Sequence, residues 1–342
     1  MIKNLIFHNY YEELNENNRM FNHANAPIGD ELLLPMIVLK EYAAKRGITI
    51  GTHTVISLDQ ADAVVFIDMP DFSSYAVRKI LKSKKPCYLI VCESKIVRPQ
   101  NYNPHLLIKF KKIFTYDDSL VDGKRFIKLN YAFDLPKKLN IDIQKKEKKY
   151  VMIAGNKMIN HPQELYSKRI EVIRWFERNH PVDFDLYGIG WDEHLFKGSW
   201  YICKLNYFRW LRRLCAPSYP SYRGSVLRKR SVMKKYRYAF CYENVSDVPG
   251  YITEKIFDSF FAGCVPIYWG ANNINDKIPS SCFIDKRKFD SYEELYKYTE
   301  GMAHIEYKNY LESIRNFLSG NQSSHFSCET FSKTLIDHID DN

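Results

Sequence analysis

Long apolar runs are missing from this chain of 342 residues, and no stretch approaches the length of a membrane span. The first residues, MIKNLIFHNYYEELNENN, hold a short apolar run followed by acidic and polar residues, which is not the pattern of a signal peptide. These absences predict a protein that is made and kept in the cytoplasm. Peripheral attachment to the inner membrane stays open.

Metal-binding cysteine patterns are missing as well, because the eight cysteines form no CxxC pair and no Cys/His cluster. We therefore expect no metal site. Four of the cysteines sit inside apolar runs, as buried reduced thiols do: Cys87, Cys92, Cys241 and Cys264. This usage suits a reducing compartment.

Basic residues are in excess, with 50 Lys and Arg against 40 Asp and Glu, for a net charge of +10. That balance favours an anionic partner: a nucleotide or sugar phosphate, an acidic membrane surface, or nucleic acid. The chain shows no recognisable RNA- or DNA-binding module, and its charge is spread along the sequence. We expect no nucleic-acid partner, and a nucleic-acid-binding protein remains a remote alternative.

Apolar runs alternate with amphipathic patterns along the whole chain, which predicts an α/β fold with parallel sheets covered by helices on both faces. Strands are expected at 3–10, 61–68, 86–94, 110–118, 124–133, 148–156, 184–191, 236–244 and 264–270. Helices are expected at 28–47, 75–85, 164–179, 253–262, 291–302 and 306–320.

A charged run from Lys145 to Lys149 interrupts this rhythm and is interpreted as a solvated linker. It divides the chain into an N-terminal domain, 1–147, and a C-terminal domain, 148–342, whose last helix could pack back on the first domain. Two doubly wound domains would face each other across a cleft. Ligands of such sheets bind at the carboxyl ends of the strands.

The segment 241–270, CYENVSDVPGYITEKIFDSFFAGCVPIYWG, concentrates polar side chains between two buried strands. Glu243 and Asn244 end the first strand at the cleft. Pro249 and Gly250 allow a tight turn and a close backbone approach.

Thr253 is the expected N-cap of the helix that follows, which begins at Glu254 and Lys255. A helix N-terminus offers free N–H groups and a positive dipole to an anion, and Lys255 adds a full charge beside it. The arrangement suits a diphosphate. Glu254 could accept hydrogen bonds from sugar hydroxyls, stabilise positive charge on a sugar ring, or simply complement the dipole.

The longer stretch YRYAFCYENVSDVPGYITEKIFDSFFAGCVPIYWG resembles the signature of the α-1,3/4-fucosyltransferases, glycosyltransferase family 10. The resemblance covers about residues 150–290. It implies a GT-B fold of two Rossmann-like doubly wound domains, with the nucleotide of the donor held by the C-terminal domain. It also implies a GDP-linked donor, usually GDP-β-L-fucose, and transfer with inversion that needs no bound metal.

Family positions carried over by this resemblance define a donor site and a general base. Lys255 is expected to contact the diphosphate and Glu254 the fucose, and Arg169, with Arg174 as its competitor, falls where the family places a phosphate-contacting arginine. The expected donor-binding set is Arg169, Glu243, Asn244, Tyr251, Thr253 and Lys255, and the expected catalytic set is Glu93 and Glu254.

Glu93, in CYLIVCES, matches the proposed general base of the family. The residues themselves support that position, because a buried strand carries Glu93 to its carboxyl end in the other domain. An ordinary strand-end carboxylate is the alternative, and Asp68 is the runner-up for the base.

The resemblance implies inverting, metal-independent transfer of L-fucose from GDP-fucose to a hydroxyl of a glycan acceptor, with an α-1,3 linkage. Bacterial surface-polysaccharide or lipopolysaccharide assembly, or protein glycosylation, is the expected setting, and no cofactor is expected. Three alternatives remain: another GDP-linked 6-deoxy or amino sugar, an inactive lectin-like member, and the remote nucleic-acid-binding protein.

Residues 200–214, WYICKLNYFRWLRRL, mix aromatic and basic side chains. If they form one helix, apolar residues line one side and basic residues the other, which suits an anionic membrane surface and a lipid-linked acceptor. An amphipathic helix packed on the protein is the alternative.

Overall fold

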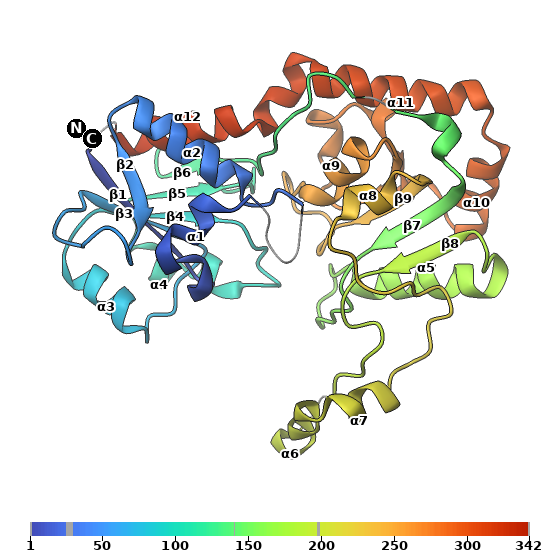
Figure 1. Ribbon diagram of the computed structural model, residues 1–342, viewed down its shortest axis with the longest axis horizontal. Helices are drawn as coiled ribbons and strands as arrows, with labels where there is room; N and C mark the ends of the chain where they lie inside the picture. Colours follow the sequence, from blue (N-terminus) through green and yellow to red (C-terminus); the bar gives the residue numbers. More distant parts are fainter. Residues whose placement is uncertain (1, 25–29, 140, 197–198, 341–342) are drawn as a thin grey trace.

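The computed structural model describes residues 2–24, 30–139, 141–196 and 199–340. Two parallel sheets, each covered by helices, lie side by side in the two halves of the molecule (Figure 1). The strands of the first sheet come from residues 4–128 and those of the second from residues 148–285.

The first sheet has the strand order β2-β1-β3-β4-β5-β6. Its strands are β1 (Asn4–Asn9), β2 (Thr49–Thr52), β3 (Ala63–Ile67), β4 (Cys87–Val91), β5 (Lys112–Thr115) and β6 (Phe126–Lys128). Its helices are α1 (Arg19–Asn22), α2 (Leu34–Lys45), α3 (Tyr75–Lys82) and α4 (Pro104–Leu107). Successive strand residues face opposite sides, so Leu5 packs in the core beneath α2 and Ile6 in the core beneath α3.

The second sheet has the strand order β11-β10-β9-β7-β8. Its strands are β7 (Lys148–Ile153), β8 (Phe184–Tyr187), β9 (Tyr236–Tyr242), β10 (Val265–Trp269) and β11 (Ile284–Asp285). The remaining helices are α5 (Tyr166–Asn179), α6 (Trp200–Cys203), α7 (Arg209–Leu214), α8 (Lys229–Met233), α9 (Glu254–Phe261), α10 (Tyr292–Gly301), α11 (His304–Ser319) and α12 (Cys328–Asp340).

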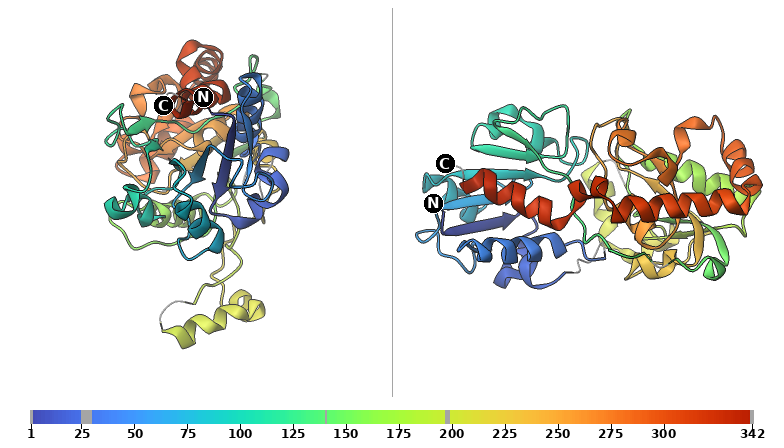
Figure 2. Two further views of the ribbon diagram at one scale, coloured as in Figure 1. Left: turned by 90° about the vertical axis from the view of Figure 1, so that its left-hand side faces the viewer. Right: turned by 90° about the horizontal axis from the view of Figure 1, so that it is seen from above.

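Helix α12 returns to the first half of the molecule and packs against α2 (Figures 1 and 2). Leu335, Ile336 and Ile339 are buried in the core of the first sheet. Asp340 accepts a hydrogen bond from the backbone N–H of Ile2 at 3.0 Å, which brings the two ends of the described chain together.

The turn at Pro249-Gly250 makes the close approach expected of it, but against the other half of the chain. The carbonyl of Pro249 accepts from the N–H of Asp118 at 3.1 Å, and the N–H of Gly250 donates to Asn273 at 2.8 Å. Gly250 has a φ of +81°, and a Cβ on it would come within 2.2 Å of the Tyr116 carbonyl oxygen. The turn is therefore part of the seam between the two halves.

The expectation of a solvated linker is wrong, and two short strands are missing from the expected set. The charged run at 145–149 is no free linker, because Lys146 is hydrogen-bonded to the Ala262 carbonyl at 3.0 Å and Lys148 and Lys149 already belong to β7. Carboxylates neutralise this strand end: Lys148 pairs with Asp185 at 2.6 Å. Short strands β2 and β11 lack the apolar runs by which the others are found in the sequence.

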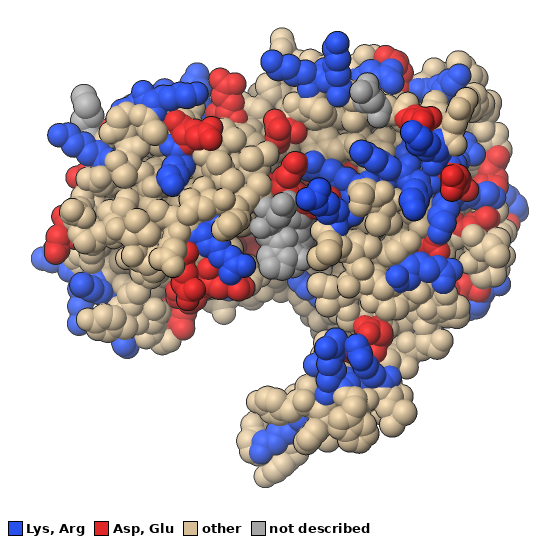
Figure 3. All heavy atoms as spheres, in the orientation of Figure 1, with Lys and Arg blue, Asp and Glu red and all other residues tan. Residues whose placement is uncertain are grey.

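Residues 199–215 stand away from the body as an arm (Figures 1, 2 and 3). They form no single helix, because α6 and α7 are joined by a 3₁₀ turn at Lys204–Tyr207. The alternative of a helix packed on the protein is also wrong, since none of the side chains of these three elements is buried. No helix among the described residues is long and apolar enough to cross a bilayer.

Candidate functional site

Each sheet has one point at which successive strands are added on opposite sides. It lies between β7 and β9 in the second sheet and between β1 and β3 in the first. Ligands of open α/β sheets bind outside the carboxyl ends of the strands at such points. Glu243 directly follows β9, Asp68 directly follows β3, and Glu93 lies two residues after β4. We call these two regions the second-sheet edge and the first-sheet edge.

The carboxylate of Glu243 is fully buried and organises the second-sheet edge. It accepts hydrogen bonds from the Thr253 backbone N–H at 2.9 Å, the Thr253 hydroxyl at 2.7 Å and Lys255 Nζ at 2.9 Å. Gly270 leaves the space for it, because a Cβ there would come within 2.5 Å of Glu243 Cγ. The structure therefore brings Glu243, Thr253 and Lys255 together as one network.

Thr253 occupies the N-cap position of α9, as expected, but its hydroxyl makes no capping hydrogen bond. It donates to Glu243 instead. Without a side-chain cap, the first turn of α9 presents N–H groups and the positive end of the helix dipole at the second-sheet edge.

Glu254 lies among ammonium groups at the start of α9. Its Oε1 is 3.8 Å from Lys229 Nζ and 4.0 Å from Lys255 Nζ. Burial raises the pKa of Glu254, but Lys255 and Lys229 outweigh it and lower the pKa to about 2. The side chain of Glu254 is therefore ionised at neutral pH. In turn, Glu243 and Glu254 outweigh the effect of burial on Lys255 and raise its pKa.

Arg169 is 3 % exposed and ties α5 to the end of β9. Its guanidinium donates to the carbonyls of Tyr242 and Glu243, both at 2.8 Å, and to Asn244 Oδ1 at 3.1 Å. Arg174 instead donates to Ser218 and stacks over the Tyr219 ring. Of the two arginines, only Arg169 lies at the second-sheet edge.

Asn244 and Tyr251 meet where the two halves touch. The Asn244 amide donates to the Tyr251 hydroxyl at 3.2 Å. Tyr251 is 1 % exposed, and its ring centroid lies 4.8 Å from that of Tyr116, which follows β5 of the first sheet. The structure places Tyr251 in the seam, with its ring in the core of the first half.

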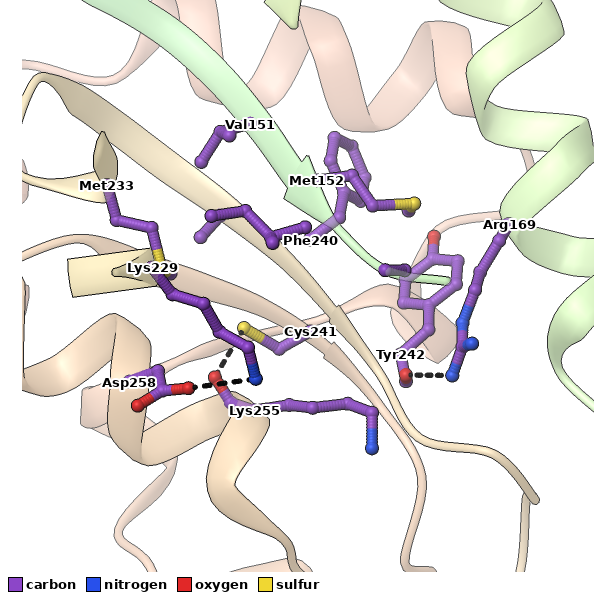
Figure 4. Close-up of a pocket in the computed structure, with 13 residues that line it drawn as sticks. Val151, Met152, Arg169, Lys229, Met233, Phe240, Cys241, Tyr242, Lys255 and Asp258 are labelled. Atoms are coloured by element: carbon purple, nitrogen blue, oxygen red, sulfur yellow. Dashed lines mark hydrogen bonds and ion pairs between the residues drawn. The ribbon is translucent and has the colours of Figure 1, made fainter. Parts of the chain in front are cut away.

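A small cavity of about 30 Å³ lies between the carboxyl-terminal parts of β7 and β9 (Figure 4). Its polar lining includes Arg169, Lys229, Lys255 and Asp258. Figure 4 shows Lys229 pointing to Asp258, and the two groups are 3.4 Å apart. Lys229 belongs to the basic stretch RKRSVMKKYRY, whose charge the sequence did not place at a site; its five-residue helix α8 takes it there.

Glu93 is half-buried on the first-sheet edge and faces the charges of α9 across the seam. Burial raises its pKa most, and Asp68 raises it further, whereas Lys255 and Lys157 act in the opposite direction. Lys255 and Glu254 thus lie within electrostatic range of Glu93, although they belong to the other half of the chain.

Asp68 lies behind Glu93. It is 2 % exposed, and its Oδ1 accepts from the N–H groups of Cys92 at 2.8 Å and Glu93 at 3.1 Å and from the amide of Asn101 at 2.6 Å. Its φ of +57° is held by this network. Burial outweighs these hydrogen bonds and raises the pKa of Asp68. The geometry fits a group that positions Glu93, which the sequence pattern did not indicate.

Among the described residues, one grouping of possible metal ligands occurs, His8, Glu12 and His53. His8 turns Nδ1 toward His53 at 3.1 Å and Nε2 toward Glu12 at 3.8 Å. One ligand atom from each of the three residues lies within 4.8 Å of the others, and the distance from His8 to Glu12 is too long for a hydrogen bond.

Residues 143–333, or 191 of the 342, match the family model described as glycosyltransferase family 10 (fucosyltransferase), C-terminal part. The chain belongs to glycosyltransferase family 10. Its relatives include an α-(1,4)-fucosyltransferase of Arabidopsis thaliana, 37% identical over 91 residues, and an α-(1,3)-fucosyltransferase of Helicobacter pylori, 29% identical over 92 residues. These matches cover 26% and 27% of this chain but only 22% and 17% of the relatives.

Solved structures similar to this family 10 chain show that it has the GT-B fold. An α1,3-fucosyltransferase determined with GDP aligns with a TM-score of 0.59 at 14% identity, over 98% of this chain and 90% of the other. The Anabaena protein HepE, determined with UDP and glucose, aligns with a TM-score of 0.56 at 10% identity over the full length of both chains.

Proposed function

We propose that this family 10 chain transfers L-fucose from GDP-β-L-fucose to a hydroxyl of a glycan acceptor with inversion. Family membership supports the reaction class. The observation that carries the mechanism is the pair of carboxylates on facing edges, Glu93 with its pKa raised and Glu254 with its pKa lowered. Environments that separate two pKa values in this way distinguish a proton acceptor from a permanent anion.

In this proposal the second-sheet edge holds the donor. Lys255, the first turn of α9 and Lys229 supply positive charge to the diphosphate, and Arg169 braces the end of β9 behind them. Glu254, held as an anion, accepts from the sugar hydroxyls and stabilises positive charge that develops on the ring. No cofactor takes part in these steps.

On the first-sheet edge, Glu93 acts as general base. The acceptor oxygen attacks C1 of the fucose on the face opposite the diphosphate, and its proton passes to Glu93. The C1–O bond to GDP breaks, and GDP leaves with the electron pair. The raised pKa of Glu93 brings its basicity closer to that needed at neutral pH.

The donor is tested by incubating the purified chain with GDP-fucose and other GDP-linked 6-deoxy and amino sugars and measuring released GDP. We expect GDP-fucose to be hydrolysed fastest. If another GDP-sugar is turned over faster, that sugar and not GDP-fucose is the donor. Salt-sensitive RNA binding without GDP binding would overturn the assignment as an enzyme. A glycan array, including lipid-linked saccharides, then tests the α-1,3 linkage and a role in lipopolysaccharide or surface-polysaccharide assembly.

A further inference from the structure

The arm at residues 199–215 exposes large apolar side chains to an extent unlike the rest of the chain. Six large side chains within fifteen residues are at least half exposed: Trp200 64%, Tyr201 75%, Tyr207 86%, Phe208 52%, Trp210 66% and Leu214 75%. Contiguous apolar surface of this kind marks a site of association in a water-soluble protein.

Basic side chains collect at the neck of the arm, where it meets the body (Figure 3). Arg209 and Arg212 both pair with Glu193, which is 8 % exposed, and Arg213 lies 3.7 Å from Asp192. These pairs fix the direction of α7 relative to the chain that enters the arm.

Toward the tip, which α6 forms (Figure 1), charged side chains are sparse and uncharged ones dominate (Figure 3). Among them are the exposed rings of Trp200 and Tyr201. Lys204 lies over the Trp200 ring, with Nζ 3.6 Å from the centroid. The sequence 192–214 has five Lys and Arg residues and two Asp and Glu residues, which leaves an excess of three positive charges. The sequence-based picture of one helix with an apolar and a basic side is therefore replaced by an apolar tip above a basic neck.

We propose that this arm inserts its tip into the interface of an anionic lipid bilayer. Tryptophan and tyrosine rings favour the boundary between headgroups and acyl chains, because one part of each ring is apolar and another can hydrogen-bond. Lys204 can extend its ammonium to the headgroups from an inserted position. The arginines of the neck then lie at the level of the lipid phosphates.

Charge also favours a bilayer over a second copy of the chain. A symmetric contact between two arms would cover the aromatic side chains but bring two basic necks together. An anionic bilayer can bury the aromatic side chains of the tip and attract the basic side chains of the neck. The inference does not depend on the transfer reaction, and it would hold the chain where a lipid-linked acceptor is found.

Flotation with vesicles of phosphatidylethanolamine and phosphatidylglycerol tests the proposal. Wild-type protein should float with these vesicles and at most a tenth as much with phosphatidylcholine vesicles. The tip variant Trp200→Ser/Tyr201→Ser/Ile202→Ser should lose at least nine-tenths of the flotation. Ile108→Ser/Val182→Ser/Ile305→Ser is the control, since it removes from the body three apolar side chains that are each at least 66% exposed, and it should float like wild type.

Thermal unfolding checks that the tip variant is folded. A second readout needs no substitution, because anionic vesicles should protect the bonds after Lys204 and Arg209 from trypsin at least tenfold. Equal flotation of the tip variant and wild type would overturn the proposal. The proposal would also be overturned if wild-type protein neither floats with the vesicles nor gains protection from trypsin. A dimer that wild-type protein forms in solution, and that the tip variant cannot form, would overturn it too.

Discussion

On the second-sheet edge, Glu254 lies between two ammonium groups, whereas on the first-sheet edge Glu93 lies beside another carboxylate, Asp68. Burial would raise the pKa of Glu254, but the ammonium groups outweigh it and lower that pKa to about 2; burial raises the pKa of Glu93, and Asp68 raises it further. Two glutamate side chains thus have pKa values that are shifted in opposite directions. A site of this kind is understood from the neighbours of each carboxylate, and the residue type alone does not distinguish them.

The largest expected effect comes from Glu93→Gln, which keeps the shape of the side chain and removes its basicity. General-base assistance is worth roughly 100- to 10,000-fold, so turnover should fall by that factor while GDP affinity stays near wild type. Initial rates and calorimetric titration with GDP separate the two quantities. A variant that keeps more than about a tenth of the turnover would remove Glu93 as the base.

Lys255→Ala tests the other edge. If Lys255 holds the diphosphate as proposed, the substitution removes a charge-assisted contact worth roughly 1.5–3 kcal/mol, so GDP affinity should fall about 10- to 100-fold. It also leaves Glu243 buried without its cation, so the free energy of unfolding should fall as well.

The double variant Glu243→Gln/Lys255→Met separates these two effects, because it removes both charges. It should recover much of the lost stability without recovering GDP affinity. If GDP binds the double variant as tightly as wild type, Lys255 supports only the fold and does not contact the donor.

Gly250→Ala should disturb the placement of the two edges relative to each other. A non-glycine residue at positive φ costs about 1–2 kcal/mol, and the added Cβ would collide with the Tyr116 carbonyl oxygen. The midpoint of thermal unfolding should drop by several degrees. Gly301→Ala is the control, since its Cβ would have nothing within 4 Å. If the two variants unfold at equal midpoint temperatures, the seam accommodates the added Cβ without loss of stability, which contradicts the prediction.

Asp68→Asn should have the smallest effect on rate, less than about tenfold, and a distinctive effect on pH dependence. A raised Glu93 pKa means that activity is lost as the pH falls through that pKa, above the ordinary glutamate value. Removing the negative charge of Asp68 lowers the Glu93 pKa, so the acid limb of the kcat/KM profile should move to lower pH. A purely structural role would reduce the rate without moving that limb.

Much of the fold can be predicted from the sequence, because buried parallel strands appear as apolar runs and the helices between them as amphipathic patterns. The runs ending at Asp68 and Tyr242 are of this kind, and they lead to the two edges. Strands β2 and β11 cannot be predicted in this way, because β2 has only four residues and β11 only two, which is too short for a recognisable apolar run. The arm escapes it too, because periodicity cannot distinguish a helix that packs on the body from one that projects from it.

By itself, the sequence determined the family, the alternation of strands and helices, and the motif that places Glu243, Thr253, Glu254 and Lys255 within thirteen residues, where local geometry suffices to bring them together. Only the tertiary structure decided that Asp68 supports Glu93, that Lys229 joins Glu254, and that Gly250 and Tyr251 belong to the seam. These contacts join segments far apart in the chain. They depend on how two sheets pack against each other, and no local pattern of residues encodes that packing.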